Sequence, residues 1–209
     1  MGDRRMTSSN RLSITLGDAI YSLRAIRRIK PDPIPDDDLK TILDAARQAP
    51  NGANRQPWHF IVLRDYEIRI KFGELFKVAW WAKRNDEGFF KPEDIPDHYK
   101  LAMGLADRIG EVPAIVLVCT TAPGGRESVI PATQHLLLAA RALGIGGTIT
   151  SLHPNVEQGV QKLVGIPDGA SVVYCIPLGY PEGRFGPVTR NPLHEIVSED
   201  TWGMAPDWV

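Results

Sequence analysis

One segment of this chain constrains the fold more than any other, because it is apolar at every position. Ala114-Ile115-Val116-Leu117-Val118 offers no polar side chain to solvent, which predicts a strand over residues 113–120 that is buried on both faces. Further strands are expected over residues 58–63 and 171–178, and helices over 18–29, 36–49, 67–82, 99–109, 128–143 and 155–164. This irregular spacing favours an α+β fold over a regular βαβ array, and 209 residues suit a single domain, 1–209.

Composition and charge narrow the class of protein. The 24 basic and 25 acidic side chains give a formal net charge of -1, whereas proteins that bind nucleic acid or anionic membranes usually carry a basic excess. We therefore expect neither as a partner. Residues 1–11 lack the apolar core of a secretory signal, and no run reaches the roughly 18 apolar residues of a membrane span. These features predict a cytoplasmic protein whose two cysteines, Cys119 and Cys175, are buried and reduced.

Three segments are expected to lie outside the packed body. Residues 1–12 are polar and predict a loose tail. Residues 83–97 contain several helix-breaking residues and predict a mobile lid or a substrate loop. Residues 199–209 include Trp202 and Trp208, which are costly to leave in water, so this tail is expected to pack on its own body or on a partner subunit.

The first two helices carry the clearest charge signals. Ala19, Ile20, Leu23 and Ile26 form one apolar stripe of the helix expected over 18–29, and Arg24, Arg27 and Arg28 cluster on a second face. Guanidinium groups are permanently charged and forked, which suits them to a phosphate, although a solvated basic face is the alternative. In the next helix, Asp36 is expected to cap the N-terminus.

Several common catalytic motifs are absent. The sequence has no GxxxxGK[ST], no GxGxxG that opens a helix, no GxSxG, no HExxH and no CxxC. We expect no metal site and no catalytic side chain that acts as a nucleophile. The remaining candidates are the arginines, the amide-rich loop 50–57, and Gly144-Ile145-Gly146-Gly147 with the residues that follow. Taken singly, the loop could be an ordinary helix-to-strand connection, and the glycines a helix C-cap.

Taken together, these blocks resemble one known family. The order Ser22-Leu23-Arg24-Ala25-Ile26-Arg27-Arg28, then Ala49-Pro50-Asn51-Gly52-Ala53-Asn54-Arg55-Gln56-Pro57-Trp58, then Ala139-Ala140-Arg141-Ala142-Leu143-Gly144-Ile145-Gly146-Gly147-Thr148 resembles the FMN-dependent nitroreductase family. The ending Pro177-Leu178-Gly179-Tyr180-Pro181-Glu182, followed by Arg190-Asn191-Pro192, fits as well. The resemblance covers about residues 18–198, and the block 49–58 is its most specific part.

The resemblance implies a central, mostly antiparallel sheet flanked by helices, in an intertwined homodimer with FMN bound at the subunit interface. By resemblance, one subunit would hold the phosphate and ribityl end of FMN with Arg24, Ala25, Arg27 and Arg190. The other subunit would contact the ribityl chain and ring with Asn51, Gly52, Ala53, Asn54 and Gln56. Thr148, Ile149 and Thr150 would lie near the isoalloxazine ring.

Two departures bear on the cofactor. Family members often have Arg-Arg-Ser where this chain has Leu23-Arg24-Ala25, so one cation and one hydroxyl are missing. Members also often have Ser in place of Asn51. We expect FMN to bind nevertheless, with Arg28 or Arg184 as candidates to compensate at the phosphate.

The resemblance implies an FMN-dependent oxidoreductase that passes electrons from NADPH or NADH to nitroaromatics, quinones or activated alkenes by a ping-pong mechanism. Two alternatives stay open at this point. One is a specialised flavin chemistry, such as fragmentation of the flavin or reductive dehalogenation. The other is an FMN-binding or sequestering protein without turnover, in which aromatic residues such as Trp80, Trp81, Phe89 or Phe90 would block the nicotinamide.

Overall fold

The computed structural model describes residues 8–209, and its centre is an antiparallel sheet with the strand order β1-β2-β4-β3. The strands are β1 (Trp58–Leu63), β2 (Ala114–Thr120), β3 (Gly146–Gly147) and β4 (Ser171–Gly179). The helices are α1 (Leu16–Ser22), α2 (Asp36–Ala46), α3 (Tyr66–Asp86), α4 (Asp97–Arg108), α5 (Arg126–Ala142) and α6 (Pro154–Val164). The predicted α+β class and the antiparallel sheet are confirmed.

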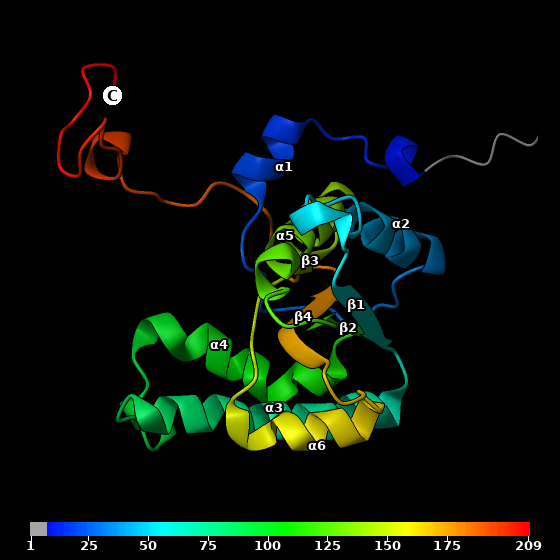
Figure 1. The fold of residues 1–209 in the computed structure, drawn as a ribbon. Coiled ribbons are helices and arrows are strands. Elements are labelled where there is room, and N and C mark those ends of the chain that lie inside the picture. The colour runs from blue at the N-terminus through cyan, green and yellow to red at the C-terminus, as the bar shows by residue number, and fades with distance from the viewer. Residues whose placement is uncertain (1–7) are drawn as a thin grey trace, which may run out of the picture.

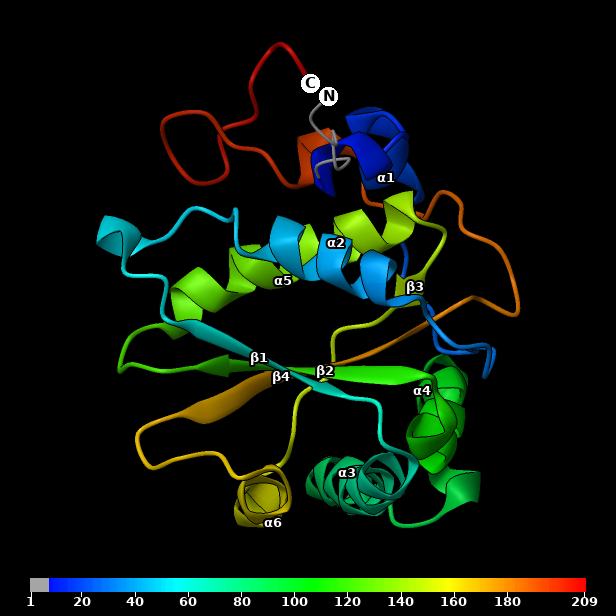
Figure 2. The ribbon, with the colours of Figure 1, turned by 90° about the vertical axis from the view of Figure 1, so that its right-hand side faces the viewer.

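Helices cover both faces of this sheet (Figure 2). α2 and α5 lie on one face, with α1 beyond them, and α3, α4 and α6 lie on the other (Figures 1 and 2). Short 3₁₀ turns connect some of these elements, at Ser8–Arg11, Gly52–Asn54, Pro92–Asp94, Ile109–Glu111 and Leu193–Glu195. The result is a three-layer arrangement with two separate apolar cores, one on each side of the sheet.

β2 belongs to both cores. Its side chains alternate between faces, so Val116 and Val118 pack in the core under α2 and α5, whereas Ile115 and Leu117 pack in the core under α3, α4 and α6. All four are fully buried. The strand also has a hydrogen-bonded neighbour on each edge, β1 and β4. The prediction of a strand buried on both faces is therefore confirmed.

The helix expected over residues 18–29 is wrong, because the chain leaves the helical conformation after Ser22. Leu23 has an extended backbone (φ -65°, ψ 128°). The following residues pair with the sheet instead: the N–H of Ile26 donates to the carbonyl of Gly147 at 2.9 Å, and that of Lys30 donates to Tyr180 at 2.8 Å. Tertiary pairing at the sheet edge outweighs the helical pattern, so the arginines of this segment extend from a strand-like edge and not from a helix face.

Two further boundaries differ from the sequence prediction. Asp36 does not cap α2, because Pro35 occupies the cap position with an extended backbone and Asp36 is the first helical residue. α3 continues to Asp86, so residues 83–86 of the segment expected to be a lid form its last turn. Only the stretch between α3 and α4 is irregular, and within it Phe89 packs in the core whereas Phe90 is exposed.

The two ends of the chain also behave differently from one another. Residues 1–7 of the expected tail lie outside the described residues, but the 3₁₀ turn Ser8–Arg11 follows them, and Arg11 pairs with Asp37 and Asp38 of α2. Residues 8–12 are therefore attached to the body. The C-terminal segment instead runs beyond α1, away from the sheet (Figure 1). Trp202 is 98% exposed and Trp208 is 68% exposed, so this tail does not pack on its own body.

We predict that Gly146→Ala destabilises the protein. A methyl group at Gly146 would lie 2.6 Å from Cγ1 and 2.8 Å from Cβ of Ile26. Because the Ile26 backbone is hydrogen-bonded to Gly147, the clash must displace the segment from the sheet edge. We expect the free energy of unfolding to fall by about 1–3 kcal/mol, measured by urea denaturation at a fixed protein concentration.

The matched control is Gly104→Ala in α4. A methyl group there meets nothing within 4 Å, and alanine is the better helix former, so stability should hold or rise by up to about 1 kcal/mol. Equal stability of the two variants would mean that the contact between Ile26 and Gly146 is not tight in solution.

Candidate functional site

Three segments that are far apart in the sequence meet around one cavity beside α5. The cavity has a volume of about 450 Å³. Its lining includes Arg24, Ala25 and Arg27 from the extended segment after α1, Gly147, Thr148 and Ile149 from β3 and its continuation, and Arg190 from the C-terminal region. Six of the residues predicted from the sequence to bind the cofactor therefore line this cavity: Arg24, Ala25, Arg27, Thr148, Ile149 and Arg190. A seventh, Thr150, follows directly after Ile149.

The backbone of β3 and its continuation shapes one wall of this cavity. Gly147 pairs with Leu178 of β4. Thr150 pairs with Cys175: the N–H of Thr150 donates to the Cys175 carbonyl at 3.1 Å, and the N–H of Cys175 donates to the Thr150 carbonyl at 2.8 Å. The alternation of an antiparallel pair turns the N–H of Thr148 toward β4 and that of Ile149 away from it, and the N–H of Ile149 forms no backbone hydrogen bond within the described part of the chain. A backbone donor beside the cavity is therefore available to a ligand with acceptor atoms.

The charge around the cavity is uncompensated. Within residues 8–209, neither Arg24 nor Arg27 forms an ion pair, and Arg190 donates only to the neighbouring carbonyl of Thr189. A neighbouring cavity of about 260 Å³ shares Arg24 and Arg27 with the first and is also lined by Arg28 and Arg184. A group of cations without partners favours an anionic ligand, and the forked guanidinium groups suit a phosphate.

The amide-rich loop does not join this group in the single chain. Residues 51–56 lie beside the N-terminus of α5, where Pro57 accepts a hydrogen bond from Thr121, whereas the arginines lie beside its C-terminal half (Figure 2). The loop is itself an unusual structure: Ala53, Asn54 and Gln56 all have positive φ angles of 51–53°. Asn51 holds it closed, because its side-chain oxygen accepts the N–H of Gln56 at 2.8 Å.

Left-handed backbone at three non-glycine residues costs free energy, and such strain is often found at functional sites. The loop residues Gly52, Ala53, Asn54 and Gln56 are exposed, and Asn51 is half-buried. The structure therefore leaves this strained loop open to a ligand or to another chain.

Sequence reasoning missed a second cavity on the other side of Thr148. It has a volume of about 220 Å³ and lies between α3, α4 and residues 148–151. Its lining shares Arg27, Thr148 and Ile149 with the first cavity and adds Lys83 and Arg84 from the last turn of α3, among others. The sequence did offer a signal for this cavity, since the adjacent cations Lys83 and Arg84 follow the aromatic pair Trp80-Trp81. The helix was expected to end at residue 82, so these two cations were assigned to a loop.

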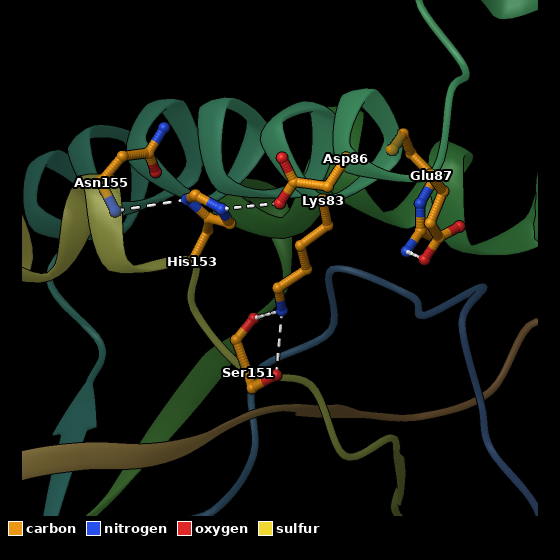
Figure 3. A network of polar contacts seen from close by, with 7 residues as sticks. Lys83, Asp86, Glu87, Ser151, His153 and Asn155 are labelled. Atoms are coloured by element: carbon orange, nitrogen blue, oxygen red, sulfur yellow. Dashed lines mark hydrogen bonds and ion pairs between the residues drawn. The ribbon is translucent and has the colours of Figure 1, made fainter.

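Polar contacts fix the last turn of α3 (Figure 3). Lys83 donates to the hydroxyl of Ser151 at 2.9 Å and to its carbonyl oxygen. Arg84 pairs with Glu87 at 2.7 Å, and His153 contacts Asp86 at 3.1 Å. Burial removes water from the Lys83 ammonium group, and this desolvation lowers the pKa of Lys83 from its usual value.

The two thiols offer no reactive group. Cys119 and Cys175 are both buried and free. Burial raises the pKa of Cys119 to about 11 and raises the pKa of Cys175 further, so neither forms a thiolate near neutral pH. In the part of the chain that the structure describes, no three His, Cys, Asp or Glu side chains gather where they could hold a metal ion. No helix there combines the length and apolar character needed to cross a membrane.

Comparison with known families agrees with this arrangement. The model of the nitroreductase family matches residues 20–180, which include Arg27, Thr148 and Ile149 that line both cavities. The chain belongs to the nitroreductase family. Its relatives include a putative NADH dehydrogenase/NAD(P)H nitroreductase of Archaeoglobus fulgidus, 33% identical over 166 residues that cover 78% of this chain and 83% of that protein. An iodotyrosine deiodinase of Thermotoga neapolitana is 29% identical over 192 residues, or 87% and 95% of the two chains.

Solved structures of the nitroreductase family share the fold. An iodotyrosine deiodinase crystallised with FMN and 3-iodo-L-tyrosine superposes with a TM-score of 0.73 at 27% identity, over 90% of this chain and all of that one. A BluB-like flavoprotein of Clostridium difficile superposes with a TM-score of 0.74 at 19% identity, over 90% of this chain and all of that one. The expected nitroreductase fold and family are confirmed.

Proposed function

We propose that this nitroreductase-family flavin oxidoreductase binds FMN and transfers electrons from NADPH or NADH to a small oxidised acceptor. The observation that carries the proposal is the cavity of about 450 Å³, in which three cations without ion pairs within residues 8–209 lie beside the unpaired backbone N–H of Ile149. Its volume falls in the range of small-molecule sites, about 300–1,000 Å³. A relative of known structure carries FMN in the same fold.

The residues present fit the chemistry of FMN. Arg24 and Arg190 would hold the phosphate, and Ala25 lets the backbone lie close to the ribityl chain. Thr148, Ile149 and Thr150 would border the isoalloxazine ring, with the N–H of Ile149 as a donor to its polar edge. Arg27 lines both cavities, so its fixed charge would lie near the ring.

When bound, FMN would supply the hydride and electron chemistry, so the protein needs no nucleophile of its own. The residues of this chain would bind and orient the cofactor and stabilise charge that develops on it. Arg27 would stabilise negative charge that the ring gains on reduction. The cavity beside Lys83 would admit the nicotinamide and then the acceptor, and one site used twice gives ping-pong kinetics. Nitroaromatics and quinones are the acceptor classes proposed.

A homodimer would complete the cofactor site. Asn51, Gly52, Ala53, Asn54 and Gln56 are exposed or half-buried at the far end of α5 from the arginines of the same chain, so a second copy would have to supply them. A groove of about 620 Å³ with a mainly aliphatic lining, including Leu12, Ile14, Leu16 and Leu138, adjoins α1 and α5. Such a surface, together with the exposed tail at 199–209, supports an intertwined dimer.

The first test is the absorbance spectrum of the purified protein, repeated without oxygen after NADPH and then NADH are added. We expect flavin bands that bleach with at least one donor, which also identifies the preferred donor. Flavin bands that persist with both would favour a sequestering role or a specialised flavin chemistry. A colourless protein that does not take up added FMN would overturn the proposal.

Arg24→Ala should weaken FMN binding more than Arg28→Ala. Arg24 lines the 450 Å³ cavity with Arg190, whereas Arg28 lines only the neighbouring one. Loss of a charge-assisted bond to phosphate should raise the Kd of FMN by about 10- to 100-fold in Arg24→Ala. An exposed cation at the rim of a site contributes little to binding free energy, so Arg28→Ala should change the Kd of FMN by less than about threefold. Fluorescence titration of the apoprotein measures both, and equal losses would contradict the assignment.

Truncation after Ser198 tests the role of the C-terminal tail. Removal of Trp202 and Trp208 takes away two large side chains that are exposed in the single chain. If the tail packs on a partner subunit, the truncated protein should dissociate at a higher concentration in analytical ultracentrifugation and retain less FMN. Trp202→Ala in the full chain is the milder companion variant. A dimer of unchanged stability after truncation would refute this packing.

A further inference from the structure

The cavity between α3, α4 and residues 148–151 has two cations, Lys83 and Arg84, that the proposed flavin site does not use, beside Arg27, which lines both cavities. Its cations are Arg27, Lys83 and Arg84, and its lining contains no carboxylate. Glu87, directly after α3, pairs with Arg84 and offsets its charge, whereas Asp86 contacts His153. Arg27 and Lys83 form no ion pair within residues 8–209, so the cavity keeps an excess of positive charge beside the position proposed for the ring.

Lys83 is the cation most available to a ligand. Its ammonium group bonds only neutral oxygens of Ser151, and it forms no ion pair within residues 8–209. An ammonium group has three donors, so one remains after the two bonds to Ser151. The desolvation that lowers the pKa of Lys83 also makes an anion at this position favourable, because a charge removed from water interacts strongly with an opposite charge.

Arg84 carries a buried donor without a partner among residues 8–209. Its side chain is only 10% exposed and lies over the Tyr99 ring, with the guanidinium carbon 4.1 Å from the ring centroid. Its Nε has no hydrogen-bond partner, although buried donors are nearly always satisfied. Glu87 occupies the other side of the guanidinium group and leaves this donor unpaired.

The rest of the cavity is apolar. Phe76, Trp80, Ala102 and Leu105 line it opposite residues 148–151. Its volume of about 220 Å³ suits a single aromatic ring with two small substituents and is too small for a dinucleotide. A ligand with a flat apolar body and one anionic group would complement both the apolar wall of this cavity and its cations.

We propose that this cavity holds the electron acceptor and that Lys83 selects acceptors with a carboxylate on an aromatic ring. The inference rests on the proposed flavin oxidoreductase function and names the substrate class for it. Lys83 binds the carboxylate, and Trp80 with Leu105 contacts the ring. In this arrangement the reducible substituent of the acceptor points toward residues 148–150, where the flavin ring is proposed.

The test compares two acceptors that differ in charge, 4-nitrobenzoate and 4-nitrobenzyl alcohol, with the FMN-loaded full-length enzyme. In Lys83→Met the KM for 4-nitrobenzoate should rise by about 10-fold or more, because a charge-assisted bond is lost. The KM for the alcohol should change by less than about twofold. Lys83→Arg should restore the preference for the charged acceptor.

Lys71→Met is the matched control, because Lys71 lies exposed on the same helix, outside the cavity, and should leave both KM values unchanged. Binding of benzoate, which is not reduced, provides a readout without turnover. Calorimetry with the oxidised enzyme should give a Kd about 10-fold higher in Lys83→Met than in the parent protein. FMN affinity should be the same in both.

Three results would overturn the proposal. The first is an equal rise of KM for the charged and the neutral acceptor. The second is a change confined to the KM for NADPH, which would assign Lys83 to a phosphate of the donor. The third is unchanged benzoate affinity in Lys83→Met. Failure of the oxidoreductase function would look different: neither nicotinamide would bleach the flavin of the unmodified protein, whereas the benzoate measurement would still report on the cavity.

Discussion

The structure depends on the burial of β2. This strand has a hydrogen-bonded strand on each edge and an apolar core on each face, so it links every layer of the molecule. Its burial determines which side chains of β1 and β4 face inward, because register with β2 sets their alternation. The helices on the two faces then pack against a surface that β2 has already defined. A polar substitution at Val116 would therefore disturb the core under α2 and α5, and one at Leu117 would disturb the core on the opposite face.

The site lies where the regular ladder of the sheet thins out at its edge. β3 is only two residues long, and beyond it only Thr150 pairs with β4, at Cys175, in the same register. The two residues between, Thr148 and Ile149, separate the two cavities and contribute to both. The edge segment that carries Arg24 and Arg27 is attached at the same place through Ile26 and Gly147. A rigid sheet thus holds a short irregular stretch that is free to contact ligands.

Much of this could be predicted from the sequence, and the exceptions have physical causes. The strands at 58–63, 113–120 and 171–178 agree with the structure within one residue, because apolar runs report burial directly. β3 has two glycines and no side-chain signal, so its pairing was invisible. The segment 23–29 has a helical pattern but follows the sheet edge, since a non-local hydrogen bond outweighs local preference. Lys83 and Arg84 were missed as site residues because α3 runs four residues further than its pattern suggested.

The position of α5 between the loop 51–56 and the arginines has a consequence for how the protein responds to dilution. If each cofactor site draws residues from two chains, then FMN and the second chain bind by linkage, and each raises the apparent affinity of the other. A dilute sample would then lose flavin not because the pocket is weak but because its other half has dissociated. Flavin content would become a measure of self-association, and the cellular abundance of the chain would help to set how much of it is active.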